Sequence, residues 1–409
     1  MKTRFLTMIL MALILVAGEA TAQSMSHSVS GVVRDAQTSK RLGQASVTAD
    51  EGHDATVTNS DGYFVLKTQE PAKVLHISCL GYETAEVRLK EGQDKELKIR
   101  LKPGVIMLSE VLVDAMDPKE VVLAAMSKIP ANYSHNNELL RCFYRETTQK
   151  GRRYIYVAEA VTDLYKAGYN RLTGSDRVAI EMGRRLVSVR CSDTLGAKIQ
   201  GGPTLPVHLD LVKKREMLLT QEELNLYQLR MEVPVVLDGR PQLVVSFEPA
   251  YITDHLLYSG RMYIDRQNLA FTRIEMSLDM SNEALATEYI LRYKPAGVRF
   301  RPRELTTTVA YRYDKGVSRM HYLHSDVRFF CEWRRKLFAS PYHVEAEMVV
   351  TDLRSTDAQP ISGRMSFSSR DSFYDKVGYF DDPNFWRDYN IIEPSESLEH
   401  AIGKLKRNK

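Results

Sequence analysis

Two histidines lie close enough in the sequence to suggest a metal site: His321 and His324, in the run His-Tyr-Leu-His. Imidazole nitrogens are common zinc ligands, so two histidines on one face of an element would be a candidate site. We expect this segment to be a β-strand, and residues three apart on a strand point to opposite faces. The two side chains would need a bend to share an ion, so the spacing favours no metal site here.

A second run resembles part of a calcium-binding loop. Asn59 and Asp61 could supply oxygen ligands, and Gly62 could be the glycine at the turn of such a loop. A complete EF-hand loop would also need an acid at the position of Val57 and a glutamate near that of Thr68. Neither acid is present. The run therefore predicts a plain turn, with Gly62 supplying a positive φ.

Other catalytic patterns are missing from the sequence. It contains no HExxH zinc motif and no GxSxG nucleophile elbow. Gly201-Gly202-Pro203 is too short to cradle a phosphate, and no Walker-type lysine follows it. The adjacent acids Asp381-Asp382 and Glu222-Glu223 are of a kind common on protein surfaces. We therefore expect no catalytic, cofactor-binding or metal-binding residues, and a protein that is not an enzyme.

The first residues predict the cellular compartment. Lys2 and Arg4 precede an apolar run at 5–17, which leads to the small-residue pattern Ala-Thr-Ala at 20–22. This is the layout of a secretory signal peptide, and the run is shorter than the ~20 residues of a membrane-spanning helix. We expect residues 1–22 to be removed and the protein to be exported, to the periplasm or the outer membrane. An uncleaved anchor is the alternative.

Charge and cysteine content restrict the kinds of partner and of metal site that this chain can have. The net charge of +4 is small for this length, which indicates no nucleic-acid partner. The short basic clusters at 213–215 and 334–336 are expected to be solvated, with lipid head groups as a second possibility. The cysteines are too far apart for a zinc knuckle, and an exported protein could either pair them or keep them as free thiols. The four are Cys79, Cys142, Cys191 and Cys331.

Short β-type runs dominate residues 29–102. Six or seven of them alternate with turn signals, at the spacing of a small antiparallel β-sandwich. The run 56–58 and the run 63–66 flank the turn at Gly62, which predicts a hairpin. Phe64 and Leu66 fall on one face of the second strand, and we expect them in the core.

Three sequence runs in this region carry a family resemblance. They read Gly-Val-Val-Arg-Asp at 31–35, Thr-Asn-Ser-Asp-Gly-Tyr-Phe at 58–64 and Ser-Cys-Leu-Gly-Tyr at 78–82. Residues 29–102 thereby resemble the carboxypeptidase regulatory-like domain, a transthyretin-like β-sandwich. Such domains accompany carboxypeptidase catalytic units and precede TonB-dependent receptors of the Gram-negative envelope. The resemblance implies an accessory, non-catalytic module.

The rest of the chain is too short for such a receptor. Fewer than 300 residues follow Val113, so we expect neither plug nor barrel. Residues 103–116 are expected to be a linker, with a short strand at 107–113. Asp117, Pro118 and Glu120 then form a strong helix start, and Pro130 should end that helix.

Long alternating strands dominate the second domain, expected at 117–390. The segments 261–278 and 305–323 predict antiparallel hairpins, and a partly helical stretch is expected at 208–229, with a capping box at 220–223. Hairpins with one apolar face need a cover. We predict an open, curved sheet wrapped around a helix, similar to the half-barrel of periplasmic lipoprotein carriers.

The last segment combines aromatic residues with an amphipathic helix. The run Phe-Trp-Arg-Asp-Tyr-Asn at 385–390 predicts either a loop that covers the sheet with buried rings or an exposed binding ledge. Leu398, Ala401, Ile402 and Leu405 fall on one face of a helix within 391–409, before a basic tail.

Together these features predict a mainly β protein with some α-helix. The leading hypothesis is a non-enzymatic binding or scaffolding protein of the cell envelope, without cofactors, whose partner is an envelope protein or an amphiphilic ligand. One alternative is a periplasmic carrier or sensor of lipid or lipoprotein that uses the concave side of the sheet. The other is a hydrolase with an unrecognised site, for which a polar cluster inside a pocket would be needed.

Overall fold

The structure is a computed structural model of the whole chain. It describes residues 27–49, 54–90, 96–104, 116–170, 175–190, 198–199, 201–251, 253–293, 296–334, 338–368, 370–371, 373–379 and 385–407. The predicted signal peptide, the predicted strand at 107–113, Cys191 and the acid pair at 381–382 lie outside these residues. Cys79, Cys142 and Cys331 are free thiols.

The N-terminal unit is a β-sandwich of seven strands. Two sheets, in the orders β4-β1-β7 and β3-β2-β5-β6, enclose a separate apolar core that contains Phe64 and Leu66. All strand pairs are antiparallel except β1 with β7, which is parallel. Gly62 adopts a φ of +71°, so the predicted turn is confirmed. The predicted hairpin of 56–58 with 63–66 is wrong, because β3 pairs with β2 and β4 pairs with β1, in the two different sheets. The strands are β1 (His27–Asp35), β2 (Ser46–Ala49), β3 (Ala55–Val57), β4 (Tyr63–Thr68), β5 (Val74–Ser78), β6 (Ala85–Arg88) and β7 (Leu97–Leu101).

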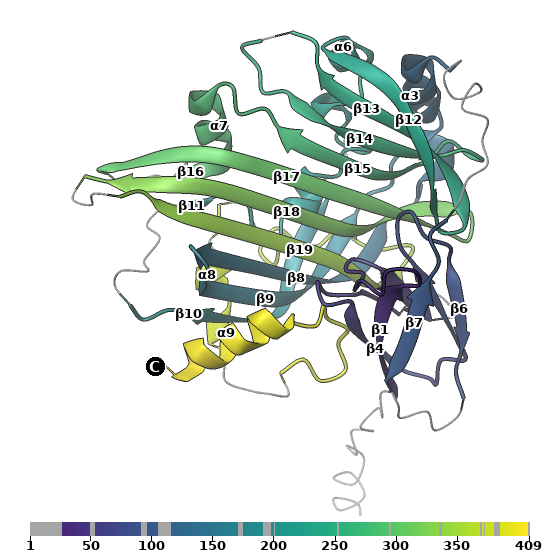
Figure 1. The fold of residues 1–409 in the computed structure, drawn as a ribbon, viewed down its shortest axis with the longest axis horizontal. Coiled ribbons are helices and arrows are strands. Elements are labelled where there is room, and N and C mark those ends of the chain that lie inside the picture. The colour runs from purple at the N-terminus through teal and green to yellow at the C-terminus, as the bar shows by residue number, and fades with distance from the viewer. Residues whose placement is uncertain are drawn as a thin grey trace, which may run out of the picture.

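The second region is built on one large open sheet. Its strand order is β12-β13-β14-β15-β17-β18-β19-β8-β9-β10-β20, and only the short β20 pairs in parallel (Figure 1). The predicted hairpins are β14–β15 and β17–β18. The strands are β8 (Glu138–Lys150), β9 (Arg153–Lys166), β10 (Arg177–Val187), β12 (Tyr227–Leu237), β13 (Arg240–Pro249), β14 (Tyr258–Asp265), β15 (Phe271–Leu278), β17 (Val298–Asp314), β18 (Val317–Trp333), β19 (Ser340–Ser355) and β20 (Gly378–Tyr379).

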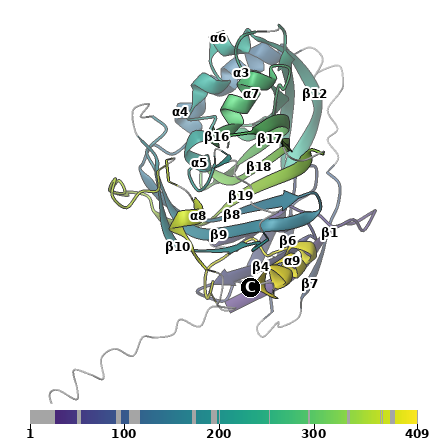
Figure 2. The ribbon, with the colours of Figure 1, turned by 90° about the vertical axis from the view of Figure 1, so that its left-hand side faces the viewer.

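Short helices lie on the concave side, and the sheet curves around them (Figure 2). A two-stranded sheet of β11 (Lys198–Ile199) and β16 (Leu291–Tyr293) lies near α7. The helices and one 3-10 turn are α3 (Pro118–Ser127), α4 (Ile129–Asn132), α5 (Leu205–His208), η2 (Arg215–Met217), α6 (Gln221–Leu224) and α7 (Glu283–Ile290).

Local capping explains where these helices begin. The Asp117 carboxylate accepts the backbone N–H groups of Lys119 and Glu120, and Thr220 caps α6 in the same way. The prediction that Pro130 stops the helix is confirmed, because α3 has its C-cap at Lys128, two residues before the proline. Helix α3 ends at Ser127, and Pro130 lies in the first turn of α4, where a missing N–H breaks no helical hydrogen bond.

Side chains fill the concave side. Val122 and Ala125 of α3, Ile290 of α7 and Leu211 of the connecting segment pack into one core with the inward side chains of the sheet. Val344, Ala346, Met348 and Val350 of β19 belong to this core, as their alternation predicted. The helical cover is therefore part of the folded interior.

The C-terminal residues cover part of the outer, opposite face. Trp386 is 5 % exposed and meets the ring of Phe143 edge-on, with 5.5 Å between ring centroids. Ile391 and Ile392 join the same cluster, together with Val57 of the N-terminal unit. The aromatic run is thus a cover of the sheet. Its flanking elements are α8 (Phe373–Lys376) and α9 (Glu396–Arg407), and α9 lies against β9 and β10 (Figure 1).

Candidate functional site

A row of polar side chains crosses ten strands on the outer face of the large sheet. Each member lies directly opposite the next in strand register, so one line of the pleat carries the whole set. We call this set the polar row. In order from β12 to β10 it consists of Arg230, Ser246, Arg261, Glu275, Thr308, His324, Glu347, Arg145, Glu159 and Arg184.

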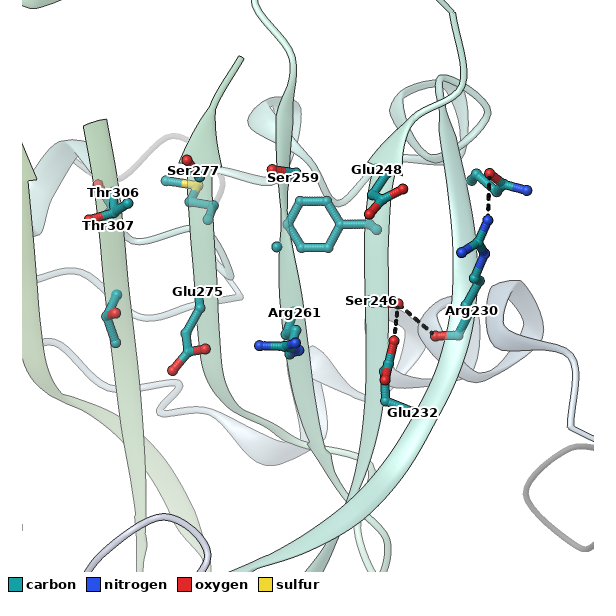
Figure 3. A pocket seen from close by; sticks show the side chains of 15 residues that line it. Arg230, Glu232, Ser246, Glu248, Ser259, Arg261, Glu275, Ser277, Thr306 and Thr307 are labelled. Atoms are coloured by element: carbon teal, nitrogen blue, oxygen red, sulfur yellow. Dashed lines mark hydrogen bonds between the residues drawn. The ribbon is translucent and has the colours of Figure 1, made fainter. Parts of the chain in front are cut away.

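The first half of the polar row is open to solvent. Together with the next line of side chains along the pleat it borders a shallow hollow of about 440 Å³, the polar trough, across β12 to β15 and β17 (Figure 3). Arg230 and Arg261 are exposed, whereas Ser246, Glu275 and Thr308 are half-buried. Hydroxyl groups line the next row: Ser259, Ser277 and Thr306.

Hydrogen bonds fix two of the three acids of the polar trough, Glu232 and Glu275. Ser246 donates to the Glu232 carboxylate at 2.8 Å, from the neighbouring strand (Figure 3). Glu275 accepts from Arg273 at 2.6 Å and from the Tyr263 hydroxyl at 3.1 Å. Burial, and then the nearby charge of Glu275, raise the pKa of Tyr263 to about 12. These two acids are therefore held in place, while the guanidinium of Arg261 lies opposite Glu275 on an exposed surface.

A glycine sets the floor of the polar trough. A Cβ atom at Gly260 would lie 1.9 Å from the backbone oxygen of Glu275, which is far inside contact distance. Only glycine lets β14 approach β15 this closely. The floor is therefore backbone, with polar side chains around it.

The other end of the polar row is covered. Glu159 is 1 % exposed and accepts from Arg145 at 2.8 Å and from Arg184 at 3.0 Å. Arg145 also donates to the backbone oxygen of Ile392 at 2.6 Å, and the Arg184 guanidinium lies 4.6 Å from the Trp386 ring centroid. This end of the row holds the C-terminal segment on the sheet.

The two histidines singled out from the sequence have different partners. His321 Nε2 lies 3.0 Å from the Ser46 hydroxyl of the N-terminal unit. His324 belongs to the polar row, and its Nε2 lies 3.0 Å from the Glu345 carboxylate of β19. The spacing along the chain could not reveal this acid, because it belongs to a neighbouring strand.

A buried ionic cluster lies on the concave side. The Asp210 carboxylate is fully buried and accepts from Lys166 and from the hydroxyls of Tyr169 and Tyr311, at 2.7 and 2.8 Å for the tyrosines. Lys166 also donates to Asp176 at 2.9 Å. Each of these groups has charged or hydroxyl partners, and the cluster ties the segment around Asp210 to β9 and β17. We interpret it as structural.

The other sequence candidates have local roles. Asn59 accepts the backbone N–H groups of Asp61 and Tyr63, and so closes the turn before β4. Glu222 and Glu223 lie in the first turn of α6, where acids stabilise a helix start. Gly202, at a φ of +83°, turns the chain before α5. None of these residues belongs to the polar row.

The polar row offers charge, hydroxyl groups and imidazole on a flat β-surface. Such a face can bind a polar surface through hydrogen bonds and ion pairs of both signs.

Among the described residues, no helix is both long and apolar enough to span a lipid bilayer.

Three solved structures resemble part of this chain. A domain described as an outer membrane lipoprotein-sorting protein, from Vibrio parahaemolyticus, is 10% identical, covering 58% of this chain and 93% of its own, with a TM-score of 0.25. A DUF1329 family protein from Desulfovibrio piger is 10% identical, covering 57% of this chain and 94% of its own, with a TM-score of 0.24. A LolA superfamily protein from Nitrosomonas europaea is 12% identical, covering 58% of this chain and 96% of its own, with a TM-score of 0.20. At these TM-scores the likenesses support no statement about function.

Sequence comparison identifies the N-terminal unit. No curated protein matches the chain. The family model of the CarboxypepD_reg-like domain matches residues 29–113, which include all of β2 to β7 and most of β1. The N-terminal unit of this chain is therefore a CarboxypepD_reg-like domain.

Proposed function

We propose that this protein is a non-enzymatic binding protein of the cell envelope, which engages an envelope protein through the polar trough. One observation carries the proposal: the concave side is filled by the protein's own side chains, whereas half of the polar row lies open on the outer face. A polar partner surface is the ligand that this half can recognise. Export to the periplasm belongs to the same proposal, and the predicted signal peptide supports it.

The chemistry of the polar trough favours a protein partner. Arg230 and Arg261 stand beside Glu232, Glu248 and Glu275, so charges of both signs alternate over a short distance. Such a pattern selects a partner whose charges match it position by position, more than a partner of opposite net charge. The binding should weaken as salt rises, because exposed charges are screened.

Charge reversal tests the proposal. The Arg230→Glu/Arg261→Glu variant should capture the partner from envelope extract at least tenfold less than wild type, as measured by quantitative mass spectrometry. The matched control reverses two exposed arginines of β17 outside the polar trough, Arg299→Glu/Arg303→Glu, and should capture it normally.

Three results would contradict the proposal. Equal capture by both double variants would exclude the polar trough as the interface. A co-purified amphiphile in native mass spectra of protein isolated from membranes would instead favour the lipid or lipoprotein carrier, and turnover of hydrolase substrates would favour the enzyme.

A further inference from the structure

A histidine and two glutamates meet on the outer face where β18 pairs with β19. Figure 1 shows these two strands side by side. His324 lies directly opposite Glu347, and Glu345 is two residues away on the same face of β19. One donor atom from each of the three side chains lies within 4.8 Å of the other two. Opposed residues of antiparallel strands have Cβ atoms about 5 Å apart, so the backbone pairing itself brings these donors together.

The two carboxylates border a small, partly open hollow of about 140 Å³. Its walls come from the sheet, from the N-terminal unit and from the C-terminal segment, which contributes Glu393. Three carboxylates thus face this space, with one guanidinium, that of Arg145. Arg145 donates to Glu159 and to the backbone oxygen of Ile392, so its hydrogen-bonding groups already have partners outside the hollow.

An unpaired hydroxyl also points to a ligand in this hollow. Thr147 lies opposite Glu345 in register, lines the same space and is 4 % exposed. Its hydroxyl has no hydrogen-bond partner among the described residues. A buried hydroxyl left unpaired destabilises the folded protein, so a bound group or its water is the expected partner.

The electrostatics of the pair favour a cation. Glu345 and Glu347 lie two residues apart on one face of β19, and both are only partly exposed. Two ionised carboxylates in one partly buried place repel each other, and a cation between them removes that repulsion. An imidazole beside them is a poor ligand for calcium but a good one for zinc.

We propose that His324, Glu345 and Glu347 bind a divalent transition-metal cation, of which Zn²⁺ is the first to test. Ligand atoms around a tetrahedral zinc lie about 3.4 Å apart, so modest side-chain rotations would close the present 4.8 Å spread. Glu345, Glu347 and Thr147 all border the hollow, so a water on the ion would have the Thr147 hydroxyl as a hydrogen-bond partner. The site does not depend on the partner surface, because Arg230 and Arg261 lie outside it.

Cobalt and zinc test the site in the full-length protein. Wild type should bind one Zn²⁺ by calorimetry, and Co²⁺ should give the visible absorption of a low-symmetry, four-coordinate ion that Zn²⁺ then displaces. His324→Ala and Glu345→Gln should each weaken Zn²⁺ binding by roughly 100-fold, with unchanged circular dichroism. Glu345→Gln keeps the shape of the side chain, so it covers the case in which His324→Ala fails to fold.

A second cross-strand pair supplies the control. His76 lies opposite Glu86 in the N-terminal unit. Among the described residues, this pair belongs to no group of three possible metal ligands. His76→Ala should leave Zn²⁺ affinity and the cobalt spectrum unchanged. A wild-type protein without a cobalt spectrum, or a spectrum that survives in His324→Ala, would overturn the proposal. The Arg230→Glu/Arg261→Glu variant should still bind Zn²⁺, which separates failure of this site from failure of the partner surface.

Discussion

Glu159 is the most deeply buried charge of the polar row. Burial raises the pKa of its carboxyl, but the charges of Arg145 and Arg184 outweigh burial and leave the pKa below its usual value. Both guanidiniums are themselves nearly buried, so the three groups depend on one another. Removing one member of such a buried set leaves uncompensated charge.

Glu159→Gln should therefore lower the free energy of unfolding by about 3–5 kcal/mol at pH 7, as measured by urea denaturation. Because the folded-state pKa of Glu159 is lowered, this stabilisation is present above the unfolded pKa and is lost as pH falls below about 4.5. The control is Glu332→Gln, which breaks a half-exposed pair with Arg301 and should cost ~1 kcal/mol or less. Equal costs for the two variants would show that Glu159 has no special role.

At the scale of elements, the edge strand β12 is protected against pairing with other chains. Pro234 cannot donate a hydrogen bond, and the register shifts between Glu232 and Val235. An edge interrupted in this way is a poor template for an added strand. This supports a binding surface on the face of the sheet, not at its edge.

Helix α9 is a second element whose role can be measured. Leu398 and Leu405 are buried against Val157 and Leu186, on the far part of the outer face. Replacing both leucines with alanine should cost at least about 2 kcal/mol for each and should release α9, seen as faster amide exchange over 396–407. His400→Ala, on the exposed face of the same helix, should change neither measurement. Normal protection in the double variant would show that α9 is held by other contacts.

At the scale of the molecule, two cores are held together by a small, mixed contact. Val57 joins the aromatic cluster of the sheet, and the Thr56 hydroxyl donates to the backbone oxygen of Ile391 at 2.9 Å. Asn390 exchanges hydrogen bonds with the backbone of Lys67 at 2.7 and 2.8 Å. The C-terminal segment thus lies between the N-terminal unit and the sheet and binds both.

His321 makes this contact sensitive to acid. Burial, and then the charge of Arg312, hold the pKa of His321 well below its usual value, while its Nε2 contacts Ser46. The unfolded chain takes up the proton first as pH falls, so the stability contributed by neutral His321 is present above pH ~6.5 and lost below it.

His321→Gln should remove this loss. Wild type should lose free energy of unfolding relative to the variant between pH 6.5 and 5, with a slope approaching ~1.4 kcal/mol per pH unit. Denaturant unfolding at a series of pH values measures the difference in free energy of unfolding between wild type and variant. The contributions of titratable groups that both proteins share, such as His324, cancel in this difference. A difference that stays constant with pH would contradict the assignment.

The sequence by itself determined the local structure and the N-terminal unit. Alternation of apolar residues, turn residues such as Gly62 and caps such as Asp117 act over a few neighbouring positions, so the strands, the two hairpins of the large sheet and the helix starts could be predicted. The apolar face of α9 could be predicted for the same reason. The hairpin expected around Gly62 could not, because β3 and β4 belong to different sheets. Pro130 shows the limit, because the sequence predicted that α3 would stop but not that the short helix α4 would start again at Ile129.

Only the tertiary structure decided which side chains meet. The polar row draws its members from strands that are far apart in the chain, and register, which no short-range pattern encodes, aligns them. His324 was recognised as a possible ligand, but Glu345 and Glu347 come from the next strand. Whether the sheet would enclose a cavity or a packed core was also beyond the sequence, because it depends on how the volumes of α3, α7 and their connecting segments add up inside the curve.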